Sequence, residues 1–112
     1  MKDVDRAFYA AHAPEGLALA GSADAANDRL LRSMLVARAA TAAADGGRIT
    51  VDLAELEFLD VAGARALWTG TTAHRMSGGT VRLTRSLPRV DRMLRLLGVH
   101  QAQGFEMEDA LE

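Results

Sequence analysis

The sequence predicts an α/β domain with a mixed, mainly parallel sheet of four to five strands and with helices packed against that sheet. Short apolar segments with alternating side chains recur along the chain, and longer segments with apolar residues at helical spacing separate most of them. The first two strand segments follow each other directly, which predicts a hairpin, whereas later strands alternate with helices, which predicts parallel pairing. The expected order is β-β-α-β-α-β-α-β, with a further weak helix at the end.

Length and composition limit the chain to one domain, residues 1–112. A chain of 112 residues can bury a single two-layer core. Its 49% hydrophobic and 25% charged residues are typical of folded proteins and argue against disorder. The formal net charge of −2 argues against nucleic acid as a partner.

Nothing in the sequence predicts a membrane segment. No apolar stretch approaches the roughly 20 residues that cross a bilayer, and the first residues lack the apolar region of a signal peptide. The absence of cysteine excludes disulfides and thiolate chemistry and agrees with a reducing compartment. We therefore expect a cytoplasmic protein without membrane insertion.

The chain is expected to begin with a hairpin. Residues 7–11 form a candidate first strand, and residues 17–20 alternate large and small apolar side chains as a second one. The proline and glycine within residues 12–16 are typical of a turn. The second strand is expected to stop at residues 21–22.

A helix is predicted over residues 25–44, where apolar side chains recur at helical spacing. Asp24 is a candidate N-cap, and the glycines at positions 46 and 47 are expected to end the helix. A strand follows over residues 48–53, and further apolar residues extend it to Asp60. The next helix should begin near Ala62 and continue to the Ser-Gly-Gly sequence at residues 77–79.

The last third of the chain predicts one more strand and one more clear helix. Val81 and Leu83 mark the strand, and Ser86 is a candidate cap for the helix, with Pro88 in its first turn. A stripe of four apolar residues should face the core, and Gly98 should end the helix. The stripe consists of Val90, Met93, Leu94 and Leu97. The final residues suggest a short strand near 101–105 and a weak acidic helix from residue 106.

Five short motifs, in order over residues 16–98, resemble the STAS family of anti-sigma factor antagonists. The motifs are Gly21-x-x-Asp24, Val51-Asp52-Leu53, Phe58-Leu59-Asp60-Val61-Ala62-Gly63, Gly78-Gly79, and Ser86-Leu87-Pro88 leading to Leu94-x-Leu96-Leu97-Gly98. The resemblance implies a STAS fold and a regulatory function that works through protein contact, without catalysis and without a cofactor.

One position departs from the pattern of that family. Its members typically carry Asp-Ser-Ser-Gly or Asp-Ser-Ala-Gly where this chain has residues 60–63, and a partner kinase phosphorylates the first residue after the aspartate. That position here is Val61, followed by Ala62, and neither side chain has an oxygen. A phosphate at a helix start adds about two negative charges and changes a contact surface. We therefore expect binding without phospho-control at residue 61, with Ser22, Thr69, Thr71 and Thr72 as formal alternatives.

The resemblance implies a partner-binding surface around residues 60–68 and the loop 22–27. The expected partner is an anti-sigma factor, an anti-sigma kinase or a related regulator. Several of these residues also have a structural interpretation: the aspartates can cap helices, the glycine can allow close packing, and the tryptophan can belong to the core. The predicted contact residues are Asp24, Asn27, Asp60, Val61, Ala62, Gly63, Arg65 and Trp68.

Three other functions stay open at this point. Some STAS domains resemble small-ligand modules of nucleotide or lipid pathways, and Asp-Val-Ala-Gly also resembles the STAS modules that accompany MEDS sensory domains. A scaffold or homodimer subunit is the third alternative. The sequence contains no recognisable nucleophile, phosphate-binding or metal motif, so we expect neither an enzyme nor a metal site. The arginines of residues 82–95 are expected to be solvated or, alternatively, to bind phosphate or an acidic partner.

Overall fold

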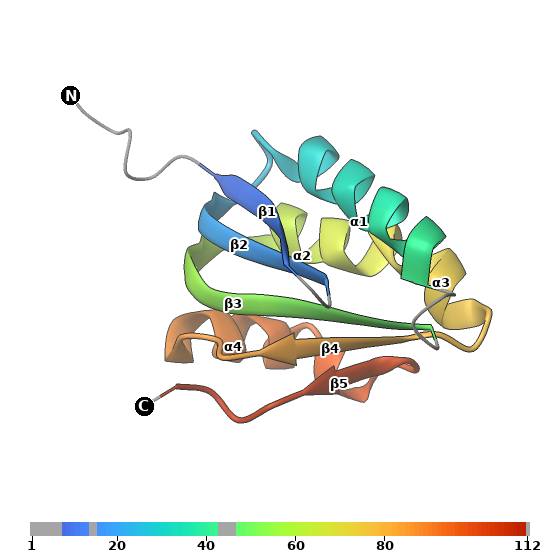
Figure 1. Ribbon diagram of the computed structural model, residues 1–112. Helices are drawn as coiled ribbons and strands as arrows, with labels where there is room; N and C mark the ends of the chain where they lie inside the picture. The colour runs from blue at the N-terminus through green and yellow to red at the C-terminus, as the bar shows by residue number, and fades with distance from the viewer. Residues whose placement is uncertain (1–7, 14–15, 43–46, 112) are drawn as a thin grey trace.

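The computed structural model describes residues 8–13, 16–42 and 47–111, and it contains a five-stranded sheet with helices on one face (Figure 1). The strands lie side by side in sequence order, with β1 antiparallel to β2 and the other pairs parallel. The predicted fold class is therefore confirmed. The elements are β1 (Tyr9–Ala13), β2 (Gly16–Ala23), α1 (Asp28–Ala42), β3 (Arg48–Leu59), α2 (Val61–Gly70), α3 (Thr72–Met76), β4 (Thr80–Thr84), α4 (Pro88–Leu96), a 3-10 helix η3 (Val99–Gln101) and β5 (Phe105–Met107).

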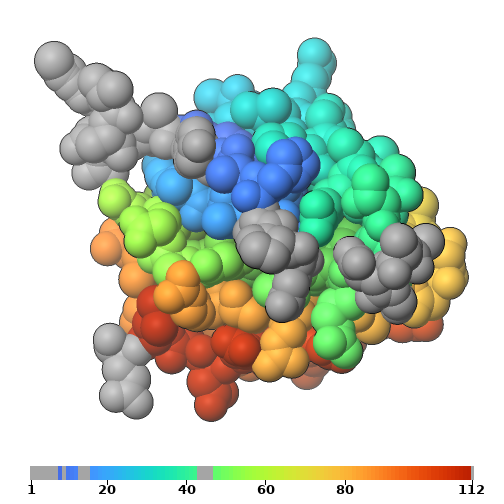
Figure 2. Space-filling view, viewed as in Figure 1, coloured from blue at the N-terminus to red at the C-terminus, as the bar shows by residue number. Residues whose placement is uncertain are grey.

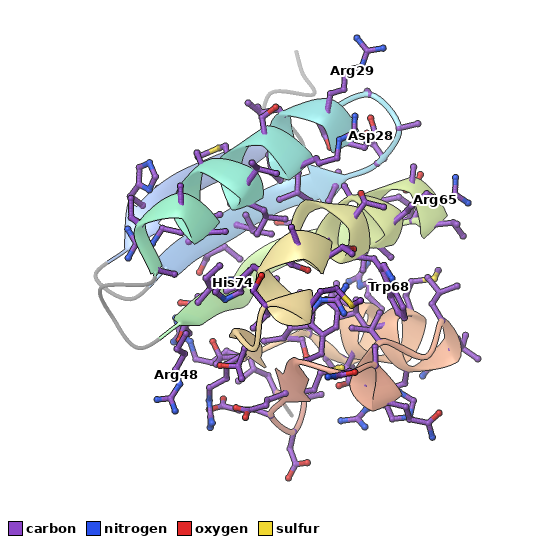
Figure 3. All side chains as sticks on the ribbon, turned by 90° about the vertical axis from the view of Figure 1, so that its right-hand side faces the viewer. Asp28, Arg29, Arg48, Arg65, Trp68 and His74 are labelled. Carbon is purple, nitrogen blue, oxygen red and sulfur yellow. The ribbon has the colours of Figure 1, made fainter. Side chains whose placement is uncertain are left out.

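The core lies between the sheet and its helical layer. Because every parallel strand is placed beside the previous one, right-handed crossovers return each helix to the same face. In Figure 3 the helices α1, α2 and α4 lie one below another in front of the strands. Alternate residues of the strands are fully buried beneath these helices, for example Leu17 and Leu19 on β2 and Val51 and Leu53 on β3. β1 and β5 are the two edge strands of the sheet, and in Figure 2 the blue residues of β1 lie above the red residues of β5 on the visible face.

The hairpin and the first helix differ from the prediction at their ends. β1 begins and ends two residues later than expected, and β2 continues through Gly21 to Ala23. Gly21 has φ 84°, and the register of β2 against β3 shifts just after it, so this glycine makes an irregularity inside the strand instead of ending it. Pro14 and Glu15 of the predicted turn, and the predicted helix end at residues 43–46, lie outside the described residues.

Asp24 does not cap α1, because the helix begins four residues later. The Asp24 N–H donates to the Asn27 side-chain oxygen at 2.9 Å, and the Asn27 N–H donates to the Asp24 carbonyl at 3.1 Å. The Asp24 carboxylate accepts the Ala26 N–H at 2.9 Å. These bonds close a turn between β2 and α1, so the polar side chains satisfy a loop and not a helix end.

The long helix predicted after β3 is interrupted at Thr71. The Thr71 hydroxyl lies 2.7 Å from the Leu67 carbonyl, and the Thr72 hydroxyl lies 2.7 Å from the Trp68 carbonyl. Hydroxyls that bond to carbonyls of the preceding turn compete with backbone N–H groups and bend helices. The segment therefore forms α2 and the short α3, both ending before Ser77 as predicted.

The predicted C-terminal elements are only partly right. Leu87 precedes α4 as its N-cap, whereas Ser86 is buried and its carbonyl accepts the Leu111 N–H at 2.7 Å. Pro88 at the helix start and left-handed Gly98 at its end are confirmed, but Leu97 is 39% exposed. Residues 99–101 form η3, β5 begins only at Phe105, and the described residues after it, 108–111, are not helical, because this segment pairs with the edge of β4.

Candidate functional site

The start of α2 is fixed by Asp60, which lies directly after β3. Its side chain accepts the Gly63 N–H at 2.9 Å, and its own N–H donates to the Ala23 carbonyl at the end of β2. The predicted capping role of Asp60 is therefore confirmed, and such a cap is worth about 1 kcal/mol. Since the bond from the Asp60 N–H to the Ala23 carbonyl joins the ends of β2 and β3, the loop after β2 and the start of α2 lie side by side.

Val61 occupies the first position of α2 and is 48% exposed, whereas Ala62 is half-buried. The isopropyl group of Val61 cannot accept a hydrogen bond, so this side chain offers no polar partner to the free N–H groups at the start of the helix. The position that the sequence singled out thus lies on the surface at a helix N-terminus. Its surface is apolar.

Gly63 brings α2 close to the sheet and offers no contact surface of its own, because it is buried. A Cβ atom at this position would lie 2.2 Å from the carbonyl oxygen of Ala23, which no real side chain tolerates. The structural interpretation, close packing, therefore accounts for this glycine. It shapes the site by setting the height of α2 above β2.

One face of α2 presents Val61, Arg65 and Trp68 to solvent at the spacing i, i+4, i+7. Arg65 and Trp68 are labelled in Figure 3, where Arg65 points away from the molecule and Trp68 lies on the side of α2 that faces α4. We call these three residues the α2 stripe. The loop residues Asp24 and Asn27 flank its N-terminal end, and Trp68 lies about two helical turns away at the other end.

Sequence reasoning missed the group that holds Trp68. The Arg75 guanidinium is buried, lies 5.3 Å from the Trp68 ring centre and 4.3 Å from that of Phe105, and donates to the carbonyls of Trp68 and Gln103 at 2.9 Å. Burial lowers the pKa of Arg75, and in the described part of the chain no carboxylate pairs with it. No local pattern predicts this cluster, because Phe105 and Gln103 are about 30 residues away in sequence.

The Arg75 cluster leaves Trp68 partly exposed and yet fixed. The Trp68 side chain is 37% exposed, its ring lies 6.0 Å from the Phe105 ring, and Arg75 covers part of it. Cation–π and tilted aromatic contacts each contribute about 0.5–1.5 kcal/mol. An aromatic side chain that is already ordered loses little entropy when a partner covers it.

Comparison with known families decides what kind of domain this is. The family model STAS_2, described as "Mlab, STAS domain", matches residues 7–108, which is most of the chain. The chain belongs to the STAS family. Among curated proteins no sequence matches it.

Solved structures support the fold of this STAS domain. The anti-sigma factor antagonist SpoIIAA in its unphosphorylated form is similar with a TM-score of 0.60 and 20% identity, and the match covers 94% of this chain and 90% of that one. A putative anti-sigma factor antagonist from Thermotoga maritima gives 0.67 and 15%, covering 91% and 86%. An anti-sigma factor antagonist from Mycobacterium paratuberculosis gives 0.64 and 19%, covering 89% and 84%.

Within the described ranges, no three His, Cys, Asp or Glu side chains lie close enough to hold a metal ion. Over the same residues, no helix has the length and apolar character required to span a bilayer.

Asp52, in the second STAS motif, has a structural role on the sheet face opposite the helices. Arg85 donates to its two carboxylate oxygens at 2.6 and 3.2 Å, and the Ala54 N–H donates to it at 3.0 Å. The Arg85 hydrogen bond holds the pKa of the Asp52 carboxyl below its usual value, although partial burial works in the opposite direction. Asp52 therefore orders the strand and its neighbour.

Replacing Arg85 with glutamine is expected to make stability less dependent on pH. Since Asp52 has a lower pKa in the folded state, its contribution is fully present above the unfolded pKa and is lost as pH falls through the folded one. Because the pair is largely exposed and screened by solvent, the free energy of unfolding should fall only slightly at neutral pH. Urea denaturation should show this difference at pH 7, and the difference should shrink as the pH falls and the Asp52 carboxyl becomes protonated; a difference that stays the same in acid would contradict the prediction.

Proposed function

We propose that this STAS domain is a non-catalytic regulatory module that binds a protein partner through the α2 stripe and the adjoining loop at Asp24 and Asn27. The partner is an anti-sigma factor, an anti-sigma kinase or a related cytoplasmic regulator. The observation that carries the proposal is the exposed apolar start of α2, together with a fixed, partly exposed aromatic side chain on the same face. The similar solved structures are themselves described as anti-sigma factor antagonists, which supports this class of partner.

The stripe combines features that favour protein binding. Aromatic and arginine side chains dominate the energetics of many interfaces, and an apolar centre with polar flanks is their usual composition. Val61 and Trp68 supply the apolar surface, Arg65 lies between them, and Asp24 and Asn27 supply the polar flank. Because Val61 has no hydroxyl, a kinase cannot add charge at this position, so we infer partner binding without phospho-control at residue 61.

The substitution Val61→Ser tests this proposal most directly. A partner kinase with ATP should phosphorylate the serine variant at residue 61 and leave that position of the wild type unmodified. Phosphorylation should then weaken binding of the variant by at least about tenfold, because a doubly charged group replaces an apolar contact. Mass spectrometry locates the phosphate, and calorimetry measures the affinity. Val61→Ala is the matched control, since it shortens the side chain without adding an acceptor.

Two results would contradict the proposal. Wild-type protein that binds no anti-sigma protein of its own genome at micromolar concentration would exclude the partner class. Phosphorylated Val61→Ser that binds as tightly as the unphosphorylated variant would place the interface elsewhere.

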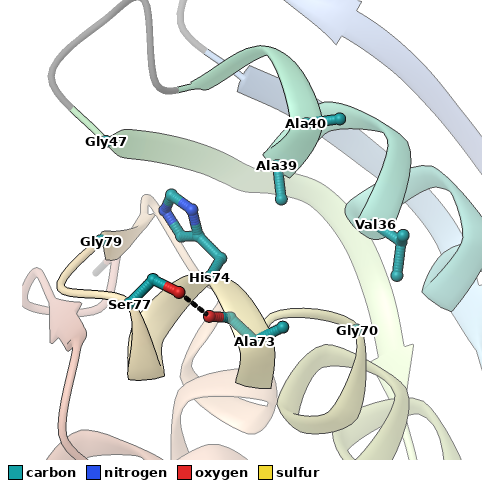
Figure 4. A pocket seen from close by; sticks show the side chains of 9 residues that line it. All are labelled: Val36, Ala39, Ala40, Gly47, Gly70, Ala73, His74, Ser77 and Gly79. Carbon is teal, nitrogen blue, oxygen red and sulfur yellow. Dashed lines mark hydrogen bonds between the residues drawn. The ribbon is translucent and has the colours of Figure 1, made fainter.

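A second candidate function, a small-ligand module, has one observation in its favour. A pocket of about 390 Å³ lies between α1 and α3 (Figure 4), and the His74 ring lies against Gly79 beside it, with Nε2 3.2 Å from the Thr80 carbonyl. Its lining is otherwise made of Val36, Ala39, Ala40, Gly47, Gly70, Ala73 and Ser77. A thermal-shift screen separates the two functions, since a ligand at 100 times its dissociation constant should add about 2.7 kcal/mol of stability.

A further inference from the structure

A second surface, beside α4 and η3, carries cationic side chains that do not belong to the α2 stripe. A cleft of about 510 Å³ runs beside α4, with Arg92 and Arg95 from the helix and His100 from η3 in its wall. The remaining lining residues are Pro88, Asp91, Leu96 and Ala110. The proposed contact with an anti-sigma partner uses none of these side chains.

Asp91 orients one of the two guanidinium groups. Both of its carboxylate oxygens accept from Arg95 Nε, at 3.0 and 3.2 Å, so the two Nη groups of Arg95 remain available for another acceptor. Arg92 is exposed and forms no hydrogen bond or ion pair with the described part of the chain. Two guanidinium groups and one carboxylate therefore line the cleft, which leaves a net positive charge among these three side chains.

His100 adds a donor of defined position. Its Nδ1 atom is sealed from solvent and has no hydrogen-bond partner among the described residues. A proton is therefore best placed on the other ring nitrogen, Nε2, where a group in the cleft can accept it. The candidate donors of the cleft therefore come from two separate elements, α4 and η3.

We propose that this cleft binds the phosphate group of a small phosphate ester. Arginine forks match phosphate oxygens in geometry, and several donors around one centre favour a tetrahedral dianion over a planar carboxylate. The volume exceeds that of a bare phosphate, and Pro88, Leu96 and Ala110 offer apolar surface to the organic part of the ester. The Asp91 carboxylate would repel the anion directly, and its bond to Arg95 reduces that repulsion.

The test is an NMR titration of the full chain with inorganic phosphate, glycerol 3-phosphate and AMP at constant ionic strength. Amide and arginine Nε signals from residues 88–100 should shift and saturate. Arg92→Gln should weaken the binding by at least about tenfold, the usual effect of removing a charged hydrogen-bond donor. Arg89→Gln is the matched control, because Arg89 lies exposed on the same helix but does not line the cleft; its affinity should change by less than about twofold.

Each outcome decides something. Equal weakening by both substitutions would show that only the overall charge of α4 attracts anions, and shifts that never saturate would show the same; either result overturns the proposal. Tighter binding of glycerol 3-phosphate or AMP than of inorganic phosphate would support it and indicate which kind of ester the apolar wall prefers. The outcome is independent of the Val61→Ser experiment, since the two surfaces share no residue.

Discussion

Replacing Gly63 with alanine should lower the free energy of unfolding by about 2–3 kcal/mol, a large share of the stability of a domain of this size. The new Cβ would lie 2.2 Å from the Ala23 carbonyl oxygen and 2.7 Å from the carbonyl carbon, so α2 must move away from β2. The cap at Asp60 and its bond to the same carbonyl resist that movement. The clash outweighs the roughly 1 kcal/mol that alanine gains over glycine in a helix.

Urea denaturation at neutral pH measures this effect. Val61→Ala provides the control. The Val61 side chain is about half exposed, so its truncation should change stability by less than about 0.5 kcal/mol. Wild-type stability in the Gly63→Ala variant would contradict the close packing of α2 on the Ala23 carbonyl.

Replacing Trp68 with alanine should weaken binding to the protein partner by at least about thirtyfold. Tryptophan is the residue most often found to dominate interfaces, and its truncation there typically costs 2 kcal/mol or more. Trp68 is suited to this role because its contacts with Arg75 hold the ring in place before a partner binds. Calorimetry or surface plasmon resonance with the anti-sigma partner measures the change.

Two further variants keep this prediction decisive. Trp68 also packs against Phe105, so its removal can destabilise the fold, and a thermal melt has to accompany the binding measurement. Arg65→Ala removes a neighbouring contact of the stripe without touching the core, and it should weaken binding while leaving the melting temperature unchanged. Met76→Ala, at a 75% exposed position on α3 outside the stripe, should affect neither. Full affinity in both Trp68→Ala and Arg65→Ala would exclude the stripe as the interface.

The sequence predicted those parts of the domain that local chemistry decides. Alternating apolar residues were enough to place β3 and β4, and an aspartate followed by three small or apolar residues was enough to place the start of α2 and its cap. Gly98 was predicted to end α4 because a left-handed residue must stand there.

The errors arose where distant contacts decide the conformation. Ser86 has the composition of a helix cap, but its segment is held by the C-terminal residues through the bond from Leu111. The strand near the C-terminus begins later than its local pattern suggests, because pairing with β4 sets its register. Asp24 is predicted as a helix cap, but its side chain and that of Asn27 bond within the turn after β2.

The arrangement around Trp68 also provides a built-in optical probe. The chain contains one tryptophan, so all indole emission comes from a single place on the protein, beside a positively charged guanidinium and at the edge of solvent. Any molecule that covers this ring must change the polarity of its surroundings and the access of quenchers such as acrylamide to the ring. Steady-state fluorescence can therefore follow complex formation without a label, whereas occupation of the cleft beside α4 should leave the spectrum unaltered.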